Sequence, residues 1–250
     1  MKKNSDGILI SVKKFGNADI IATFLTENFG VLSGLIKGGQ SRKFKGIYQL
    51  GGVFNIEWMA RLSDQLGTIT ANLIHQYCPF IIDKIVNLEL LSCTCNMLVE
   101  LSIGEEKSSE IYRDTMLLLK NFCDDNLSKK DICKVYFLYE KNLLSNLGFA
   151  FELEKCNVSG SREKSELKYI SPTTAKAVSN MGAIGYEKKL FKMPEFFIIE
   201  KDASCIENLE FKYADDVLSY FFEKNLFVHK FSMNILTARN RLVKKIITKL

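Results

Sequence analysis

The periodicity of the apolar residues changes near Pro79, and this change constrains the fold more than any other feature of the chain. Before Pro79, short runs rich in Ile, Val, Phe and Thr alternate with turn signals such as FGNAD and KGGQS, a pattern typical of β-strands. One connection, between the third and fourth runs, is long. This arrangement predicts a small closed barrel of the OB type, and the strand count leaves an SH3-like barrel open as the alternative. The expected strands are Gly7–Lys13, Ile20–Leu25, Val31–Lys37, Val53–Met59 and Thr68–Ala71.

After Pro79 the apolar residues recur at helical spacing. The third helical stripe stops at Gly148, and glycine is a common residue just past the end of a helix. The predicted fold is therefore α+β, with a five-stranded OB-type barrel over residues 1–79 and a mainly α-helical domain over residues 80–250. Helices are expected over residues 80–101, 110–122, 130–147, 171–191, 213–226 and 237–249.

Composition and cysteine content favour a cytoplasmic protein without a membrane span. Of the 250 residues, 47% are hydrophobic, which is close to the average for soluble proteins. No window approaches the roughly 18 apolar residues that a spanning helix needs, and Asp6 and Lys13 interrupt the only apolar run near the N-terminus. The 7 cysteines are an odd number, and several lie in apolar, helix-like stretches. We therefore expect reduced thiols rather than disulfides.

The positive charge of the chain is concentrated in two zones. The net charge is only +5, but there is no acid between Glu27 and Glu57, and none from Lys224 to the last residue. Ordinary solvated surface charge would explain this distribution. Two acid-free basic zones also indicate a polyanionic partner, if folding brings them onto one face.

The first zone contains LIKGGQSRKFKG, in which four basic residues share a short segment with three glycines and Phe44. The spacing matches neither a phosphate-binding Walker A loop nor a Rossmann loop, because Ile47 and not Lys follows Gly46. Lysine and arginine neutralise phosphates, and an exposed aromatic ring can stack on a base. We therefore predict a basic loop that contacts a nucleic-acid backbone, and the sequence leaves open whether Phe44 stacks on a base or packs beneath the loop. The basic residues are Lys37, Arg42, Lys43 and Lys45.

The second zone, TARNRLVKKIITKL, has the pattern of an amphipathic helix. Its apolar residues, among them Leu242 and Ile246, are expected to pack inward, while Arg239, Arg241 and the neighbouring lysines are expected to remain solvated. Binding to a membrane surface is the less favoured alternative, because the helix lacks a broad aromatic apolar face.

Catalytic and metal-binding signals are weak. The two histidines, His75 and His229, do not neighbour a plausible nucleophile motif. Cys93 and Cys95 have one residue between them in a helical stretch, so their side chains would point to different faces. A metal-dependent nuclease would need carboxylates that converge from several elements, and no such set is marked in the sequence. The residues themselves therefore indicate neither a catalytic centre nor a cofactor site, and they leave a nuclease open as an alternative.

The succession of motifs resembles the bacterial RecO family of recombination mediators. GILISVKKFGNADIIATFLTENFGVLSGLIKGG is similar to the first three OB strands of that family, and QSRKFKGIYQLGGVFNIEW with LGTIT is similar to the rest of the barrel. LLSNLGFAFELEKCNVSG, YISPTTAKAVS and ARNRLVKKI follow in the family's order. Some members carry a four-cysteine zinc site where this chain has CNVSG. Here Cys156 is present but Ser159 replaces the second cysteine and no second pair follows, so the resemblance implies a loop at residues 156–170 that lacks the metal ligands.

The resemblance implies a non-enzymatic DNA-repair protein located in the cytoplasm with the nucleoid. Such a protein would bind single- and double-stranded DNA, anneal complementary strands, and help to load RecA onto strands coated by single-strand binding protein. The implied partners are RecR, the acidic and hydrophobic C-terminal tail of single-strand binding protein and, indirectly, RecA. An RNA-binding OB protein and a metal-dependent nuclease are the alternatives. The DNA-binding candidates are Lys37, Arg42, Lys43, Lys45 and Phe44, with Arg239 and Arg241 from the family's terminal helix.

Overall fold

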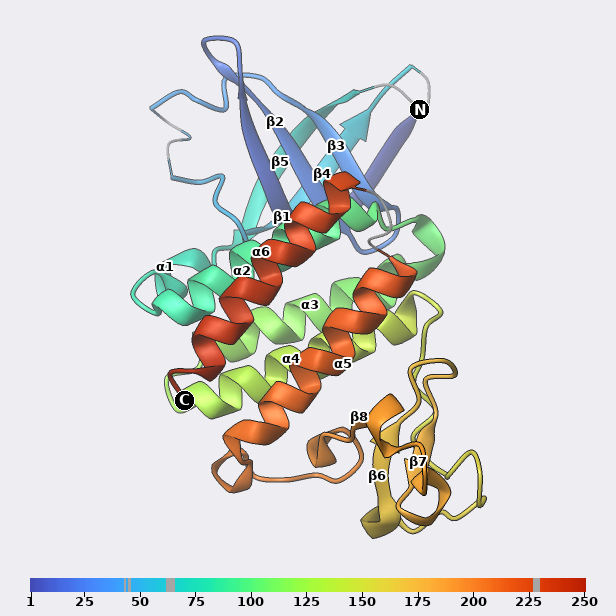
Figure 1. Ribbon diagram of the computed structural model, residues 1–250. Coiled ribbons are helices and arrows are strands. Elements are labelled where there is room, and N and C mark those ends of the chain that lie inside the picture. Colours follow the sequence, from blue (N-terminus) through green and yellow to red (C-terminus); the bar gives the residue numbers. More distant parts are fainter. Residues whose placement is uncertain (43, 45, 62–65, 227–229) are drawn as a thin grey trace. The chain divides into compact units, whose positions relative to one another are not determined.

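The computed structural model describes residues 1–42, 44, 46–61, 66–226 and 230–250, and the side chains of residues 230–232 are not described. The chain divides into two compact units, Met1–Asp124 and Asp125–Leu250. Each unit is described below by itself, with the element labels of Figure 1.

The first unit contains a closed five-stranded barrel in which the strands follow the order β1-β2-β3-β5-β4. The long β1 pairs with both β2 and β4 in antiparallel fashion, and β3 and β5 close the barrel as its parallel pair. Five strands with a long connection after the third confirm the predicted OB-type barrel and the α+β class. The strands are β1 (Lys2–Phe15), β2 (Asp19–Thr26), β3 (Gly30–Ile36), β4 (Val53–Met59) and β5 (Gly67–His75).

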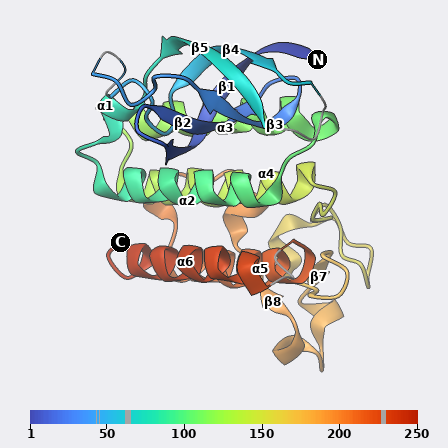
Figure 2. The same cartoon turned by 90° about the horizontal axis from the view of Figure 1, so that it is seen from above.

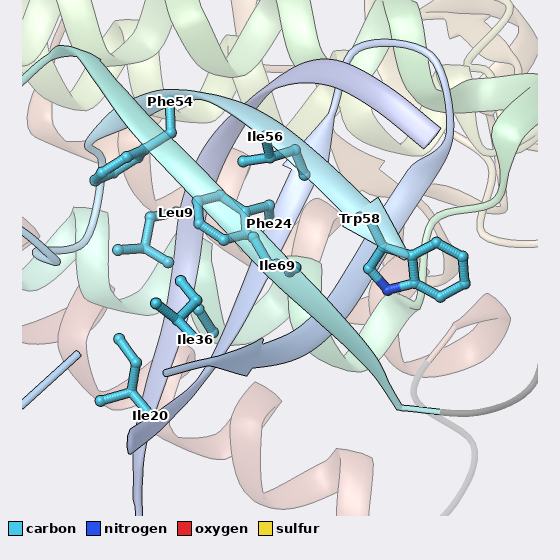
Figure 3. Close-up of a cluster of buried hydrophobic side chains, with 9 residues drawn as sticks. Leu9, Ile20, Phe24, Ile36, Phe54, Ile56, Trp58 and Ile69 are labelled. Atoms are coloured by element: carbon cyan, nitrogen blue, oxygen red, sulfur yellow. The ribbon is translucent and has the colours of Figure 1, made fainter. Parts of the chain in front are cut away.

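Large apolar side chains fill the barrel (Figure 3). Side chains alternate along β4, and Phe54, Ile56 and Trp58 all lie in this core. The indole Nε1 of Trp58 donates a hydrogen bond to the Ser33 carbonyl at 3.0 Å. A Cβ on Gly67 would lie 2.3 Å from that nitrogen, so the indole and the start of β5 fit together only if residue 67 is glycine. The nine core residues are Leu9, Ile20, Ala22, Phe24, Ile36, Phe54, Ile56, Trp58 and Ile69.

Two longer helices pack against the barrel within the first unit. The helix α2 contacts β1, while α3 contacts β1, β2 and β3 (Figure 2). The start of α3 is fastened to the β2–β3 turn by Ser108, whose hydroxyl donates to the Thr26 carbonyl and accepts from the Gly30 amide at 3.0 Å. These helices lie where helical spacing predicted them. Their bounds are α1 (Cys78–Ile81), α2 (Ile85–Leu101) and α3 (Ser108–Cys123).

The second unit consists of three long helices and a small sheet. The helix α4 begins with a capping box, in which the side chains of Ser128 and Asp131 each accept a hydrogen bond from the other's backbone amide. The helices α5 and α6 lie side by side (Figures 1 and 2). The small sheet has the order β7-β6-β8, and β8 contacts α5. The elements are α4 (Lys129–Asn146), β6 (Leu167–Ile170), β7 (Ala177–Ser179), β8 (Phe191–Lys192), α5 (Asn208–Asn225) and α6 (Lys230–Ile247).

The prediction of a helix over residues 171–191 is wrong. This stretch instead contains β7 and two 3₁₀ turns, Met181–Ala183 and Glu187–Lys189. Its helical hydrogen bonding ends after one turn, where the Ala175 amide donates to the Ser171 carbonyl at 2.9 Å. Ala175 then has a φ of +56°, a left-handed conformation that stops a right-handed helix. Among the described residues, none of the helices is both long and apolar enough to cross a membrane.

Candidate nucleic-acid interface

The basic segment after β3 is fastened to the tip of the β1–β2 hairpin. The side-chain amide of Gln40 donates to the carbonyls of Asp19 and Gly16, at 2.6 Å and 3.2 Å. The backbone amide of Gln40 donates to the Ala18 carbonyl at 2.8 Å. The Gly38 amide donates to the Asp19 carboxylate, also at 2.8 Å. Two stretches of chain that are about twenty residues apart in sequence therefore form one piece of surface.

This surface combines positive charge from both stretches. Lys37 and Arg42 are exposed on the segment, as predicted from the sequence. Lys13 and Lys14 are exposed at the end of β1. In the register of the sheet, Lys13 lies opposite Ile21 on β2, which lies opposite Leu35 on β3, two residues before Lys37. Paired residues share a face of a sheet, so Lys13 lies on the face of Leu35, and Lys37 follows directly after the last residue of β3.

The remaining sequence-predicted members of the loop have different outcomes. Lys43 and Lys45 lie outside the described residues, so their assignment stays a prediction. Phe44 is half-buried, and its ring centroid lies 5.9 Å from that of Tyr48. Tyr48 in turn stacks on the core residue Phe54 at 5.5 Å. The ring of Phe44 thus belongs to a row of aromatic side chains that leads into the barrel, which favours packing over base stacking.

Sequence reasoning missed the contribution of the β1–β2 hairpin. Lys13 was assigned to the predicted strand Gly7–Lys13, and neither Lys13 nor Lys14 was counted as part of the basic surface. The signal was present, because the turn GNAD brings the end of the first strand beside the second, and the second strand pairs with the one that leads into the basic segment. Asp19 is the single acid within residues 13–19 and 37–46, and its carboxylate accepts from the Gly38 amide.

Arg239 in α6 corrects a prediction. The helix forms as expected, and Arg241 is exposed. Arg239, however, is completely buried, with 0% of its surface exposed, so the expectation that it remains solvated is wrong. A phosphate cannot reach a guanidinium in this position. We therefore remove Arg239 from the DNA-binding candidates and keep Arg241 as an untested one.

Two buried carboxylates from neighbouring helices hold this guanidinium. Its Nε and Nη2 donate to the carboxylate of Glu140 on α4, with 2.9 Å for the Nε bond, and its Nη1 donates to Asp215 on α5. Nη1 also donates to the hydroxyl of Ser219 at 2.8 Å. Burial alone lowers the pKa of Arg239, but the charges of Glu140 and Asp215 raise it above its ordinary value. The three helices of the second unit are thus connected at one charged centre, which we call the Arg239 triad (Glu140, Asp215 and Arg239).

The loop at residues 156–170, which the resemblance implies lacks metal ligands, begins at Cys156. The Cys156 sulfur accepts backbone N–H groups from Ser159 at 3.3 Å and Ser179 at 3.2 Å. The hydroxyls of those two serines lie 3.3 Å apart. A Cβ on Gly182 would lie 3.2 Å from the same sulfur. Residues 156, 159, 179 and 182 therefore lie close together, as two pairs whose members are three positions apart in the sequence.

The side chains at those four positions do not fit a zinc ion. They provide one thiol, two neutral hydroxyls and, at Gly182, no side chain, whereas structural zinc takes four thiolate or imidazole ligands. The second pair of turn positions, at residues 179 and 182, was not recognised in the sequence because neither residue is a cysteine. Burial raises the pKa of Cys156, but hydrogen bonds from Ser159 and Ser179 lower it to about 6.

Of the two histidines, His75 packs among aromatic side chains. His75 packs against Tyr77 with ring centroids 4.4 Å apart, and it stacks parallel to Phe80 at 6.2 Å. His229 lies outside the described residues. Within the described part of the chain, no three His, Cys, Asp or Glu side chains are grouped so that they could hold a metal ion.

Comparison with known proteins decides the family. Residues 1–77 match the family model described as "Recombination protein O N terminal", and residues 85–232 match "Recombination protein O C terminal". The chain belongs to the RecO family. Proteins named "DNA repair protein RecO" are similar over most of their length. That of Rickettsia canadensis (strain McKiel) is 32% identical over 221 residues, which are 88% of this chain and 88% of the relative.

Two further RecO proteins have similar coverage. The one from Hyphomonas neptunium (strain ATCC 15444) is 32% identical over 250 residues, which are 98% of each chain. The one from Granulibacter bethesdensis is 30% identical over 220 residues, which are 88% of this chain and 86% of the relative. Membership of the RecO family supports a role in DNA repair and recombination, and the barrel with its basic surface is the RecO N-terminal part.

Proposed function

We propose that this protein is a recombination mediator that binds DNA through the basic surface of its OB barrel. The observation that carries the proposal is the joining of two basic stretches by Gln40, which places Lys13, Lys14, Lys37 and Arg42 on one part of the barrel. In OB folds generally, the strand 2–3 face and the loop between strands 1 and 2 bind oligonucleotides. The surface on this barrel includes that loop.

The proposed activity is annealing of complementary strands, followed by help in loading RecA onto strands coated by single-strand binding protein. Annealing breaks and forms no covalent bonds. A cationic surface screens the repulsion between two phosphate backbones and raises their local concentration, while bases remain available for pairing. The proposal therefore includes no enzymatic step and no cofactor. It also includes RecR and the acidic tail of single-strand binding protein as partners, in the cytoplasm with the nucleoid.

The direct test is annealing of complementary oligonucleotides that have been coated with the cognate single-strand binding protein. We expect faster annealing in the presence of the protein, without ATP. Spontaneous and protein-dependent rates that are equal would contradict the proposal. A competition between DNA and RNA of the same sequence addresses the main alternative, because strong RNA preference without annealing would identify an RNA-binding protein.

The contribution of the basic surface is tested by the salt dependence of binding. Each phosphate contact to single-stranded DNA contributes about 0.7 to the slope of log K against log salt. Lys37→Ala combined with Arg42→Ala should therefore reduce the slope by about 1.4. The matched control removes two exposed cations from α3 of the same unit, Arg113→Ala with Lys120→Ala, and should leave the slope unchanged. Equal slopes for the two double variants would show that the basic surface does not touch phosphates.

A further inference from the structure

Phe15 is an exposed aromatic side chain within the basic surface. It is the last residue of β1, and half of it, 50%, is exposed. It lies two residues after Lys13, and so on the same face of the strand. The backbone of this turn is held in place, because the Gln40 side chain donates to the carbonyl of the next residue, Gly16, at 3.2 Å. The ring therefore projects from a backbone that is already held beside the cations.

There is open space beside the turn that carries this ring. A Cβ placed on Gly16 would meet no atom within 4 Å, and the same holds for Gly38 on the adjoining segment. Asp19, opposite Phe15 in the register, is the nearby acid, and its carboxylate accepts from the Gly38 amide. An anionic ligand thus meets Lys13 on the same face as the ring and Lys37 on the adjoining segment, with one acid that is already hydrogen-bonded.

Phe44, the aromatic residue of the basic segment itself, does not offer such a platform. It is half-buried and contacts Tyr48, which stacks on the barrel core. Of these two phenylalanines, Phe15 is the one directed at the surface. The position of the stacking residue therefore differs from the one that the sequence of the loop alone indicates.

We infer that Phe15 stacks on an unpaired base of single-stranded DNA whose phosphates contact Lys13, Lys37 and Arg42. The inference rests on the proposed DNA-binding function and adds a preference for one form of DNA. Phosphates are present in single strands and in duplexes, so the cations serve both. The faces of bases inside a duplex are already covered by their neighbours, so an aromatic ring at the surface gains a stacking partner only from a single strand. Phe15 thus makes the site selective for unpaired strands.

The test compares the affinity of each variant for an oligodeoxythymidylate and for a duplex of equal length at one salt concentration. Stacking on an aromatic side chain changes affinity by about fivefold or more per base. We expect Phe15→Ala to weaken binding of the single strand about tenfold and to leave duplex binding within about twofold. Phe15→Leu keeps an apolar side chain without a flat ring and should behave like Phe15→Ala. Phe80→Ala removes another exposed phenylalanine, 58% exposed on α1, and should change neither affinity.

Phe15→Trp provides a direct spectroscopic reading. The chain has a single tryptophan, Trp58, which is only 3% exposed in the barrel core. Single-strand affinity should be retained in this variant, and its added fluorescence should be quenched by oligodeoxythymidylate but not by the duplex.

Different failures have different meanings. If the wild type binds both DNA forms but Phe15→Ala and Phe15→Leu retain full single-strand affinity, the inference is overturned and the proposed function stands. Equal losses of affinity for both DNA forms would overturn stacking in favour of a general contact. Wild-type affinity of Phe15→Leu, with a loss for Phe15→Ala, would overturn it in favour of a purely apolar contact. If the wild type binds no DNA at all, the proposed function and the inference fail together.

Discussion

Replacing Arg239 by methionine should destabilise the second unit severely, because this residue is fully buried and paired with two carboxylates. Methionine is long and apolar, so the change removes the charge and the hydrogen bonds while most of the volume is kept. The carboxylates of Glu140 and Asp215, whose side chains are 1% and 3% exposed, then lose their counter-charge in a buried site. Removing one partner of a buried ion pair typically costs about 3–5 kcal/mol of the free energy of unfolding.

The size of this loss follows from burial, because neither carboxylate is exposed enough to be hydrated once the guanidinium is gone. The destabilisation of Arg239→Met relative to wild type should therefore be about 4 kcal/mol, the middle of that range.

Urea unfolding followed by circular dichroism at 222 nm measures these differences, while the fluorescence of Trp58 reports on the barrel. Arg241→Ala removes an exposed arginine two residues away and should change stability by less than about 0.5 kcal/mol. Replacing the whole Arg239 triad by apolar residues, with Arg239→Met, Glu140→Leu and Asp215→Leu, should recover most of the loss, because no uncompensated charge remains. A loss for Arg239→Met no larger than that for Arg241→Ala would refute this reasoning.

Two other predictions concern single residues. Gly30→Ala should lower the free energy of unfolding by at least about 2 kcal/mol, because the new Cβ would lie 2.2 Å from the Ile103 carbonyl oxygen at a φ of +71°. Gly16→Ala, at a φ of +56° with open space around the new Cβ, should lower it by only about 1 kcal/mol. Thermal or urea unfolding measures both values. The thiolate absorbance at 240 nm should show a titration near pH 6 that is missing in Cys156→Ser, because the pKa of Cys156 is lowered to about 6 from 9.0. The pKa of Cys156 is lower in the folded protein than in the unfolded chain. The stability of wild type relative to Cys156→Ser should therefore be highest above pH 9 and should fall as the pH drops through 6. A stability difference that is independent of pH would contradict this prediction.

The barrel was predictable from sequence because its pattern is local. Alternation along 53–58 places Phe54, Ile56 and Trp58 on one face whatever the rest of the chain does, and the structure confirms it. The helices α2 to α4 were likewise evident from spacing and from Gly148. The stretch 171–191 failed because its conformation depends on pairing between β6 and β7, which are separated in sequence by a turn with Ala175 at positive φ. Such pairing leaves no local periodicity.

The position of Arg239 shows a different limit. Its spacing from Leu236, Val243 and Ile246, which are all buried, places it on the apolar stripe of α6 and could have identified it. Residue type was given more weight than position, because arginine is rarely buried unless it is paired. Its partners lie 99 and 24 residues earlier in the chain, so nothing near it in sequence marks the compensation. The basic surface was predictable only in part for the same reason. Its basic segment is one continuous stretch of sequence, but the hydrogen bonds that join this segment to the β1–β2 hairpin connect residues far apart in the chain.

The amide of Gln40 has a consequence for the speed of recognition. By fixing the turn after β1 to the segment after β3, it keeps cations from both stretches in place before any ligand arrives. Ordering a free backbone residue costs about 1–2 kcal/mol, and here that cost is met during folding and not during encounter. Association should then be governed by diffusion and electrostatic steering, without a preceding conformational step, so a change at Gln40, which carries no charge, should slow the capture of a strand.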